Sequence, residues 1–452
     1  MKYPWSKTVF PIAAIFSFRM LGLFLLIPVF SIYAENLQGA TPALIGLALG
    51  IYGLGQGLLQ MPFGFFSDKI GRKPIITFGL ILFACGSILG ALTDSIYGMI
   101  LARAIQGTGA IGSVLIALLA DLTPDGQRTK AMAVIGMTIG TSFSLAMIIS
   151  PALSHRYGLA GIFYLTAALA LLGLLLLHGV IPQPTKERFH SDSEANPALF
   201  KQVIRNKHLL RLDVGIFCQH FILTSTFFAI PFILRKQVEQ GHLAQQWHFY
   251  LPLMLGSFLL MIPFIIIAEK KKLMKGIFLS SVMIITVAQL LLAYTYQNWL
   301  SLCLLMLVFF VAFNILEAAL PSLVSKQAQP NSKGTAMGIY STSQFLGIFI
   351  GGALAGLLYQ WNGSPGIFLV NALVAALWFV ISYAMKPNVY VATLILACDW
   401  FDKKEEVVNQ LLSAPGILEV AFAKEEQVLY LRVDREHYAE GSAEQILRAA
   451  SR

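Results

Sequence analysis

The sequence predicts an all-α membrane protein with twelve transmembrane helices in two six-helix halves, followed by a small C-terminal α+β domain of ferredoxin-like type. Composition is the first observation behind this prediction, because hydrophobic residues make up 57% of the 452 residues and charged residues only 12%. With a mean hydropathy of +0.71, an ordinary soluble protein is excluded. The second observation is a series of twelve apolar runs, and the third is a change to soluble-type composition after Pro387.

Each apolar run has the roughly 20 residues that a helix needs to cross the hydrocarbon core of a bilayer. Short turns separate most of the runs, which lie at about 9–34, 43–66, 74–94, 97–120, 131–154, 159–181, 210–234, 247–268, 274–295, 298–322, 335–359 and 363–385. The first run is long, rich in Phe and without a small-residue cleavage site. It therefore indicates a retained helix and not a signal peptide.

The apolar runs and the polar segments between them divide the chain into four parts. Residues 1–181 form the first six-helix half, 182–209 a cytoplasmic linker with several Pro, Ser and acidic residues, 210–386 the second half, and 387–452 the cytoplasmic tail domain. The halves share traces of a parallel repeat, because Met61-Pro62-Phe63 recurs as Ile262-Pro263-Phe264. Such a repeat predicts a substrate path between two halves that move against each other.

The distribution of Lys and Arg predicts the orientation, because cytoplasmic loops carry an excess of these residues. If the N-terminus is cytoplasmic, the opposite side has only Arg156, Arg235 and Lys236, and the other loop cations are cytoplasmic. The sequence therefore predicts a multi-pass protein of a bacterial inner membrane with both termini in the cytoplasm. The net charge of +9 reflects this topology, so we expect membrane lipids and no nucleic acid as partners.

A charged turn between the second and third runs is the most informative motif of the chain. It contains Gly64, Asp68, Gly71, Arg72 and Lys73 in the pattern G-x-x-x-D-[RK]-x-G-[RK]-[RK]. This pattern resembles the loop 2–3 signature (motif A) of the major facilitator superfamily of secondary transporters.

The resemblance implies the superfamily fold and a role for the turn as a conformational latch. Asp68 would stabilise the outward-open state by lying near the start of the eleventh span, at Gly334 and Thr335, where exposed N–H groups attract an anion. Arg72 would pair with Asp121 at the end of the fourth span. The alternative is a tight turn that only anchors the protein by its positive charge.

Polar residues inside the first half are candidates for proton coupling or for the central cavity. Arg103 and Gln106 resemble the R-x-x-Q-G signature of the superfamily, in which the arginine is linked to proton transfer. An arginine inside a span costs roughly 2.5–3.5 kcal/mol on insertion scales and should face a partner or water. The alternative is a structural hydrogen-bond cluster that ties this span to the first one, which holds Arg19.

The second half has its own candidates for the same roles. Asp213 and His220 lie seven residues apart in the seventh span, and Asn314 and Glu317 lie three apart in the tenth. Buried carboxyl and imidazole groups can bind and release protons near neutral pH, so they suit a proton-driven cycle. Alternatively, Asp213 is a solvated residue at the cytoplasmic interface.

The tail has the element order β-α-β-β-α, which is that of a ferredoxin-like domain without its final strand. It resembles the YAM domain of some superfamily transporters. Copper-binding relatives of this fold use C-x-x-C after the first strand, whereas this loop has Cys398 alone, so copper binding is not expected. A regulatory role and a merely stabilising role both stay open.

Together these features predict a proton-coupled secondary transporter that exports small amphipathic compounds, in the manner of drug/proton antiporters, by alternating access. We expect a monomer with a small-molecule substrate and protons as partners, no metal, no cofactor and no enzymatic activity. A proton symporter for nutrient uptake and a non-transporting receptor with a signalling tail are the alternatives. The fifth span keeps only Pro151 from the G-P-x-x-G-G end typical of exporters, which weakens the antiporter reading.

Overall fold

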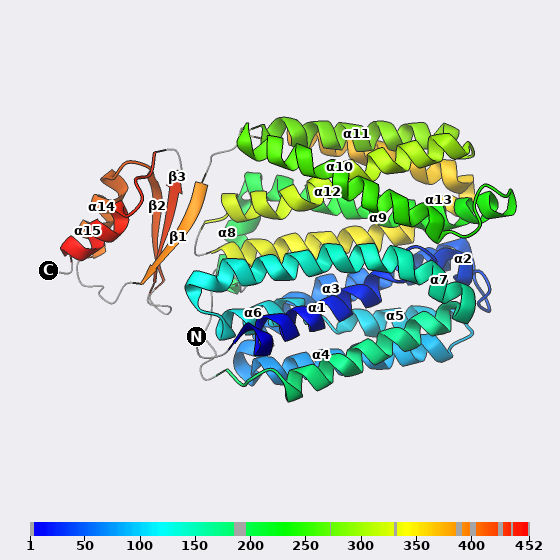
Figure 1. The fold of residues 1–452 in the computed structure, drawn as a ribbon, viewed down its shortest axis with the longest axis horizontal. Helices are drawn as coiled ribbons and strands as arrows, with labels where there is room; N and C mark the ends of the chain where they lie inside the picture. The colour runs from blue at the N-terminus through cyan, green and yellow to red at the C-terminus, as the bar shows by residue number, and fades with distance from the viewer. Residues whose placement is uncertain are drawn as a thin grey trace.

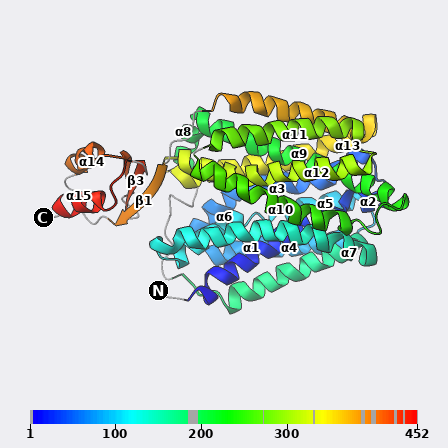
Figure 2. The ribbon, with the colours of Figure 1, turned by 45° about the horizontal axis from the view of Figure 1, so that its top comes forward.

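The computed structural model describes residues 4–184, 196–271, 273–329, 332–385, 391–397, 404–423, 428–434 and 437–450. It has two parts, a large helical bundle and a small α/β domain beyond one end of that bundle (Figures 1 and 2). The N-terminus lies at the same end. We call this end of the bundle the tail end and the opposite one the far end.

The first half contains seven α-helices after a short 3-10 turn at Trp5–Lys7. They are α1 (Val9–Phe24), α2 (Phe30–Ala34), α3 (Pro42–Ile70), α4 (Arg72–Leu92), α5 (Ile96–Thr108), α6 (Gly112–Leu122) and α7 (Asp125–Gly179). The sequence predicted a single helix for each of the runs 9–34 and 97–120. The structure has a pair of helices in each instead. The first break contains Pro28, which has no N–H for a helical hydrogen bond, and the second begins at Gly109.

The second half begins with a 3-10 turn at Pro197–Leu199. Its helices are α8 (Phe200–Arg205), α9 (Lys207–Glu239), α10 (Trp247–Lys270), α11 (Met274–Thr295), α12 (Trp299–Gln327) and α13 (Lys333–Tyr383). Asn206 and Asn298 cap α9 and α12, because each side chain accepts a hydrogen bond from a backbone N–H of the first turn.

Two of these elements are helical hairpins. The helices α7 and α13 contain 55 and 51 residues, which at 1.5 Å per residue is about 77–83 Å, more than twice the thickness of a bilayer core. Each is broken by a glycine with positive φ, Gly158 (62°) or Gly363 (63°). Ten helices of the described chain are long and apolar enough to span a membrane. Because α7 and α13 each cross twice, the predicted twelve-helix fold is confirmed.

The two halves pack most closely where α3 meets α13. Glycines of both helices allow the backbones to touch, since a Cβ on Gly352 would lie 2.9 Å from the Cα of Gly50. Aromatic rings add to the contact, with Phe143 of α7 stacked 6.5 Å from Phe313 of α12. At the far end, Arg235 and Glu35 form an exposed ion pair of 2.9 Å between the halves.

The small domain contains β1 (Val391–Ala397), α14 (Lys404–Ser413), β2 (Ile417–Ala423), β3 (Val428–Asp434) and α15 (Ser442–Ala450). Its antiparallel sheet has the order β1-β3-β2, as expected for a ferredoxin-like sheet without the strand beside β1. Leu429, Leu431 and Val433 alternate into the core under the helices. On the opposite face Arg432 donates a 2.9 Å hydrogen bond to the carbonyl of Lys326, near the end of α12.

Candidate transport site

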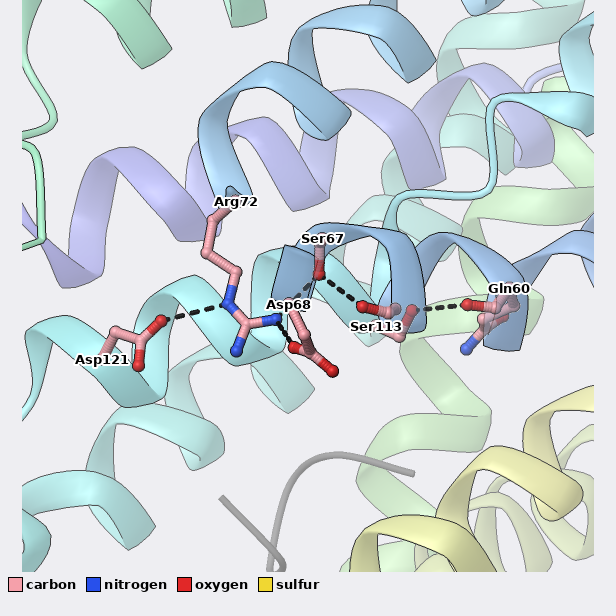
Figure 3. Close-up of polar contacts among 7 residues, drawn as sticks. Gln60, Ser67, Asp68, Arg72, Ser113 and Asp121 are labelled. Atoms are coloured by element: carbon pink, nitrogen blue, oxygen red, sulfur yellow. Dashed lines mark hydrogen bonds and ion pairs between the residues drawn. The ribbon is translucent and has the colours of Figure 1, made fainter. Parts of the chain in front are cut away.

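The charged turn joins α3 to α4 at the tail end (Figure 3). Gly71 has a φ of 107°, a left-handed conformation that favours glycine, and it lets α4 begin directly at Arg72. The Arg72 side chain is only 1% exposed. Its Nε donates to Oδ2 of Asp121 at 3.1 Å, and its Nη1 donates to Ser67 at 2.7 Å and to the carboxylate of Asp68.

Further contacts fix the neighbouring helices around this turn. Ser113 of α6 donates a 2.8 Å hydrogen bond to the carbonyl of Gln60 in α3. A Cβ at Gly64 would lie 3.5 Å from the Ser113 hydroxyl, an ordinary van der Waals distance, so the close approach of α3 and α6 does not itself require a glycine there. Lys73 donates to the carbonyl of Ile181 at 2.6 Å, so it connects the start of α4 to the chain just after α7.

Asp68 faces the second half across a pocket. The pocket is lined by α3, α6 and α13, with Asp68, Phe65 and Ser113 on one side and Gly334, Met337 and Ser341 of α13 on the other. The carboxylate of Asp68 is hydrogen-bonded to Arg72 and, within the described chain, to no backbone N–H of α13. The predicted proximity to the start of α13 is therefore present as a shared pocket, without a direct hydrogen bond.

The two candidate arginines inside the spans of the first half, Arg19 and Arg103, lie in two separate hydrogen-bonded groups. Arg19 of α1 donates to Gln56 of α3, and Gln56 in turn donates to the carbonyl of Gly107 in α5 at 2.8 Å. This chain ties the first span to the fourth through a residue, Gln56, that sequence reasoning missed. The connection between these two spans therefore runs through Gln56 and the Gly107 carbonyl, whereas Arg103 and Gln106 belong to a separate group.

The second group centres on Arg103 in α5. Its Nη1 donates to Gln106 at 2.9 Å, and Gln106 donates to Ser87 of α4 at 2.8 Å. The guanidinium lies 4.7 Å from the ring centroid of Tyr52, a cation–π distance. Tyr52 and Ser87 had no signal in the sequence, because an isolated Tyr or Ser in an apolar run does not reveal its partner.

Three helices of the second half meet at Glu317. Its Oε2 accepts a 2.9 Å hydrogen bond from Gln219 of α9 and lies 3.9 Å from Nε2 of His220. The same His220 nitrogen is 2.8 Å from the side-chain nitrogen of Gln344 in α13. The Glu317 side chain is 35% exposed, whereas that of His220 is 6% exposed. The carboxyl and the imidazole are therefore near each other but beyond hydrogen-bond distance, and each is instead in contact with an amide, Gln219 or Gln344. Both groups can bind a proton, and an amide can serve as donor or acceptor beside them.

The remaining two candidates of the second half lie outside this cluster. Asn314 donates to Ser257 of α10 at 3.1 Å, so it connects α12 to α10. Asp213 is buried near the start of α9, with 4% exposure, and within the described chain its Oδ1 is buried without a hydrogen-bond partner. The expectation that Asp213 could be a solvated interface residue is therefore wrong.

A fully buried amide network was not predicted. Asn371 of α13 donates to Thr226 at 3.1 Å and to Gln289 at 3.2 Å, and it accepts a 2.6 Å hydrogen bond from Ser225. These side chains fix α9, α11 and the second arm of α13 together. Within the described residues, no group of three His, Cys, Asp or Glu side chains could hold a metal ion, and Cys398 lies outside those residues.

Known proteins with similar sequences are transporters. The chain is 43% identical over 446 residues, 98% of either protein, to the inner membrane transport protein YajR of Escherichia coli (strain K12). It is 35% identical over 380 residues to an uncharacterized transporter of Buchnera aphidicola (subsp. Baizongia pistaciae), covering 83% of this chain and 96% of the relative. Identity to the quinolone resistance protein NorA of Staphylococcus aureus (strain MSSA476) is 25%, over 77% of this chain and 89% of NorA.

Solved structures and the family comparison agree with this result. A bacterial homolog of the human lysosomal transporter Spinster has the same fold, with a TM-score of 0.67 at 13% identity, over 83% of this chain and 95% of the homolog. Residues 12–352 and, in an overlapping match, 254–393 match the Major Facilitator Superfamily. On this match and on the relative at 43% identity, the chain belongs to the major facilitator superfamily.

Proposed function

We propose that this protein is a proton-coupled secondary transporter of a bacterial inner membrane that exports small amphipathic compounds by alternating access. The observation that carries the proposal is the 3.9 Å approach of His220 to the accessible carboxylate of Glu317. A carboxyl and an imidazole are both groups that can bind and release a proton. They lie where α9, α12 and α13 of the second half meet, so a proton bound there can respond to movement of these helices.

The charged turn would set the balance between the two states of the cycle. Asp68 lies on the first half and shares its pocket with the start of α13 on the second half. When that pocket closes, the N–H groups of the first turn of α13 can stabilise the carboxylate. The pairing of Arg72 with both Asp68 and Asp121 supports this role, because it fixes the direction in which Asp68 points.

An amphipathic substrate and outward transport are favoured by aromatic rings between the halves and by one relative. Phe143 of the first half and Phe310 and Phe313 of the second half bring their rings together between the halves, which suits an aromatic or apolar compound. The relative NorA is named for quinolone resistance, a property that export provides. We propose that both termini are cytoplasmic, as the Lys and Arg distribution indicates, and that the transporter acts as a monomer.

The test is transport by purified protein in liposomes, with a fluorescent quinolone and a panel of other amphipathic compounds as probes. An antiporter accumulates the probe when the lumen is acidic, and a symporter does so when the lumen is alkaline. We expect accumulation with an acidic lumen, and we expect Glu317→Gln and His220→Ala each to reduce it while the protein stays folded. Full gradient-driven accumulation by the double variant would assign these two residues to structure and refute the proposed coupling site.

A further inference from the structure

Asp213 is a buried acid that the proposed coupling cluster does not use. We infer that Asp213 is a second proton-binding carboxyl of the second half, placed between Glu317 and the tail end, with Tyr340 between the two acids. The inference deepens the proposed proton coupling and rests on it. Its evidence is the position, burial and neighbours of Asp213.

The burial of Asp213 has a direct consequence for its charge. The side chain is 4% exposed, and one carboxylate oxygen is fully buried without a hydrogen-bond partner in the described chain. An ionised carboxylate in such a place is expensive unless a cation or several donors compensate it. A proton removes the charge at once, so the neutral acid is the form that this environment favours.

The neighbouring helices supply no compensating cation among the described residues. Tyr340 of α13 lies close enough to Asp213 and to Glu317 for electrostatic interaction with both acids, and it is itself buried. Leu320 of α12 and Trp378 of α13 pack beside Gly215, two residues along α9 from Asp213. Arg211, two residues before Asp213, points elsewhere and donates to the carbonyl of Ala384 at 3.1 Å.

The positions along the helices place these groups in order. At 1.5 Å per residue, Asp213 lies about 9 Å from the start of α9 and Tyr340 about 10 Å from the start of α13. Glu317 lies about 15 Å from the end of α12, and His220 about 20 Å from the start of α9. These helix ends are all at the tail end, where α8 and the small domain lie (Figure 1). Along the bundle, Tyr340 and Asp213 therefore lie nearer to the tail end than His220 and Glu317 do.

Infrared difference spectroscopy of the purified full-length protein over a pH series tests this inference without a substrate. The C=O stretching band of protonated carboxyl groups should contain a component that Asp213→Asn removes and a different component that Glu317→Gln removes. Tyr340→Phe should shift the pH at which either component appears, because it changes the group between the acids. Asp94→Asn is the matched control, since Asp94 is exposed at the far end and its loss should leave both components unchanged.

The result that would overturn the inference is an unchanged carboxyl band in Asp213→Asn. If that variant does not fold, Asp213→Glu keeps the carboxyl group, and its component should remain with a shifted frequency; a frequency identical to that of the unaltered protein would also overturn it. The proposed function fails separately, because it requires loss of gradient-driven transport in Glu317→Gln. If the band component depends on Asp213 but the protein shows no gradient-driven transport, then Asp213 binds a proton as inferred and the proposed proton-coupled transport is wrong.

Discussion

Arg72 at the start of α4 and Asp121 at the end of α6 form a buried ion pair, with 3.1 Å between Nε and Oδ2 and no exposed surface on the Asp121 side chain. The same guanidinium holds Asp68 through Nη1. Arg72 thus connects α6, through Asp121, to Asp68, the acid of the turn, which faces α13 across the pocket. Changes at Asp68 and at Asp121 should consequently have different effects, the first on conformation and the second on stability.

The first prediction concerns the conformational role of Asp68. Asp68→Asn keeps the shape and removes the charge, so it should weaken the state in which the tail end is closed. A charge at a helix terminus is worth about 0.3–2 kcal/mol, which shifts a balanced equilibrium several-fold. The measurement is the rate at which a water-soluble maleimide labels Ser341→Cys, on the pocket wall, in a background without the four native cysteines.

Labelling of Ser341→Cys should be several-fold faster with Asp68→Asn, and Asp68→Glu should restore part of the original rate. Arg72→Ala should act in the same direction, because it releases Asp68. Lys69→Gln is the control, since this neighbouring cation lies over the ring of Phe65 and not in the pocket. Equal labelling rates and equal transport for Asp68→Asn and the unaltered protein would mean that the turn only anchors the protein by its positive charge.

The second prediction concerns the energy of the buried pair. Removal of one partner of a buried ion pair costs about 3–5 kcal/mol, because the other charge stays buried. Arg72→Ala and Asp121→Asn should each lower the free energy of unfolding. The double variant should lose less than the sum of the single losses, by about 1–3 kcal/mol, in chemical denaturation of the purified protein.

The exposed pair Arg235–Glu35 is the internal standard for this cycle. Its side chains are 46% and 39% exposed, and exposed pairs couple by about 1 kcal/mol or less. The same cycle with Arg235→Ala and Glu35→Gln should therefore give a small coupling energy. A coupling energy for Arg72 and Asp121 as small as that of the exposed pair would mean that the two buried charges do not stabilise each other.

The sequence predicted the crossings well but not their continuity. An apolar run indicates that a segment lies away from water, and all twelve predicted crossings are present. It does not report whether the helical hydrogen bonds continue, so the breaks at Leu25–Val29 and Gly109–Ile111 were missed. Conversely, α7 and α13 are continuous hydrogen-bonded elements, and only Gly158 and Gly363 mark where each turns back.

The candidate site could be predicted only where charge or a motif marked it. The pairing of Arg72 with Asp121 followed from the family resemblance, and Glu317 and His220 were conspicuous as titratable groups in apolar spans. Gln219 and Gln344, the amide partners of Glu317 and His220, were not predicted, and neither was Gln56, the partner of Arg19. A single amide in an apolar run has no spacing signal, and its partner depends on how separate helices pack.

The third prediction concerns the small domain. The small domain contacts the bundle through a hydrogen bond from Arg432 to the carbonyl of Lys326, and a hydrogen bond contributes about 0.5–1.5 kcal/mol. Deletion of residues 387–452 should therefore leave the bundle folded. Size-exclusion chromatography should give one symmetric peak, and the thermal midpoint should fall by no more than Arg432→Ala lowers it in the full-length protein. Aggregation of the shortened protein would show that the domain is part of the folding unit.

The fourth prediction concerns the glycine contact between the halves. A Cβ on Gly352 would lie 2.9 Å from both Cα and N of Gly50, and one on Gly50 would meet the carbonyl of Phe349. Since both neighbours are backbone, they cannot rotate away, and α3 and α13 must move apart. Gly352→Ala should therefore loosen the packing between the halves and lower the thermal midpoint of the purified protein.

Gly136→Ala in α7 is the matched control, because a Cβ at that position has no neighbour within 4 Å. Alanine is intrinsically more favourable than glycine in a helix by about 1 kcal/mol, so the control should be neutral or slightly stabilising. The contact therefore predicts that Gly352→Ala lowers the thermal midpoint and that Gly136→Ala does not, although both substitutions make the same chemical change. A stabilising effect of Gly352→Ala equal to that of Gly136→Ala would mean that the halves do not approach at this point, and the close packing of α3 against α13 would be wrong.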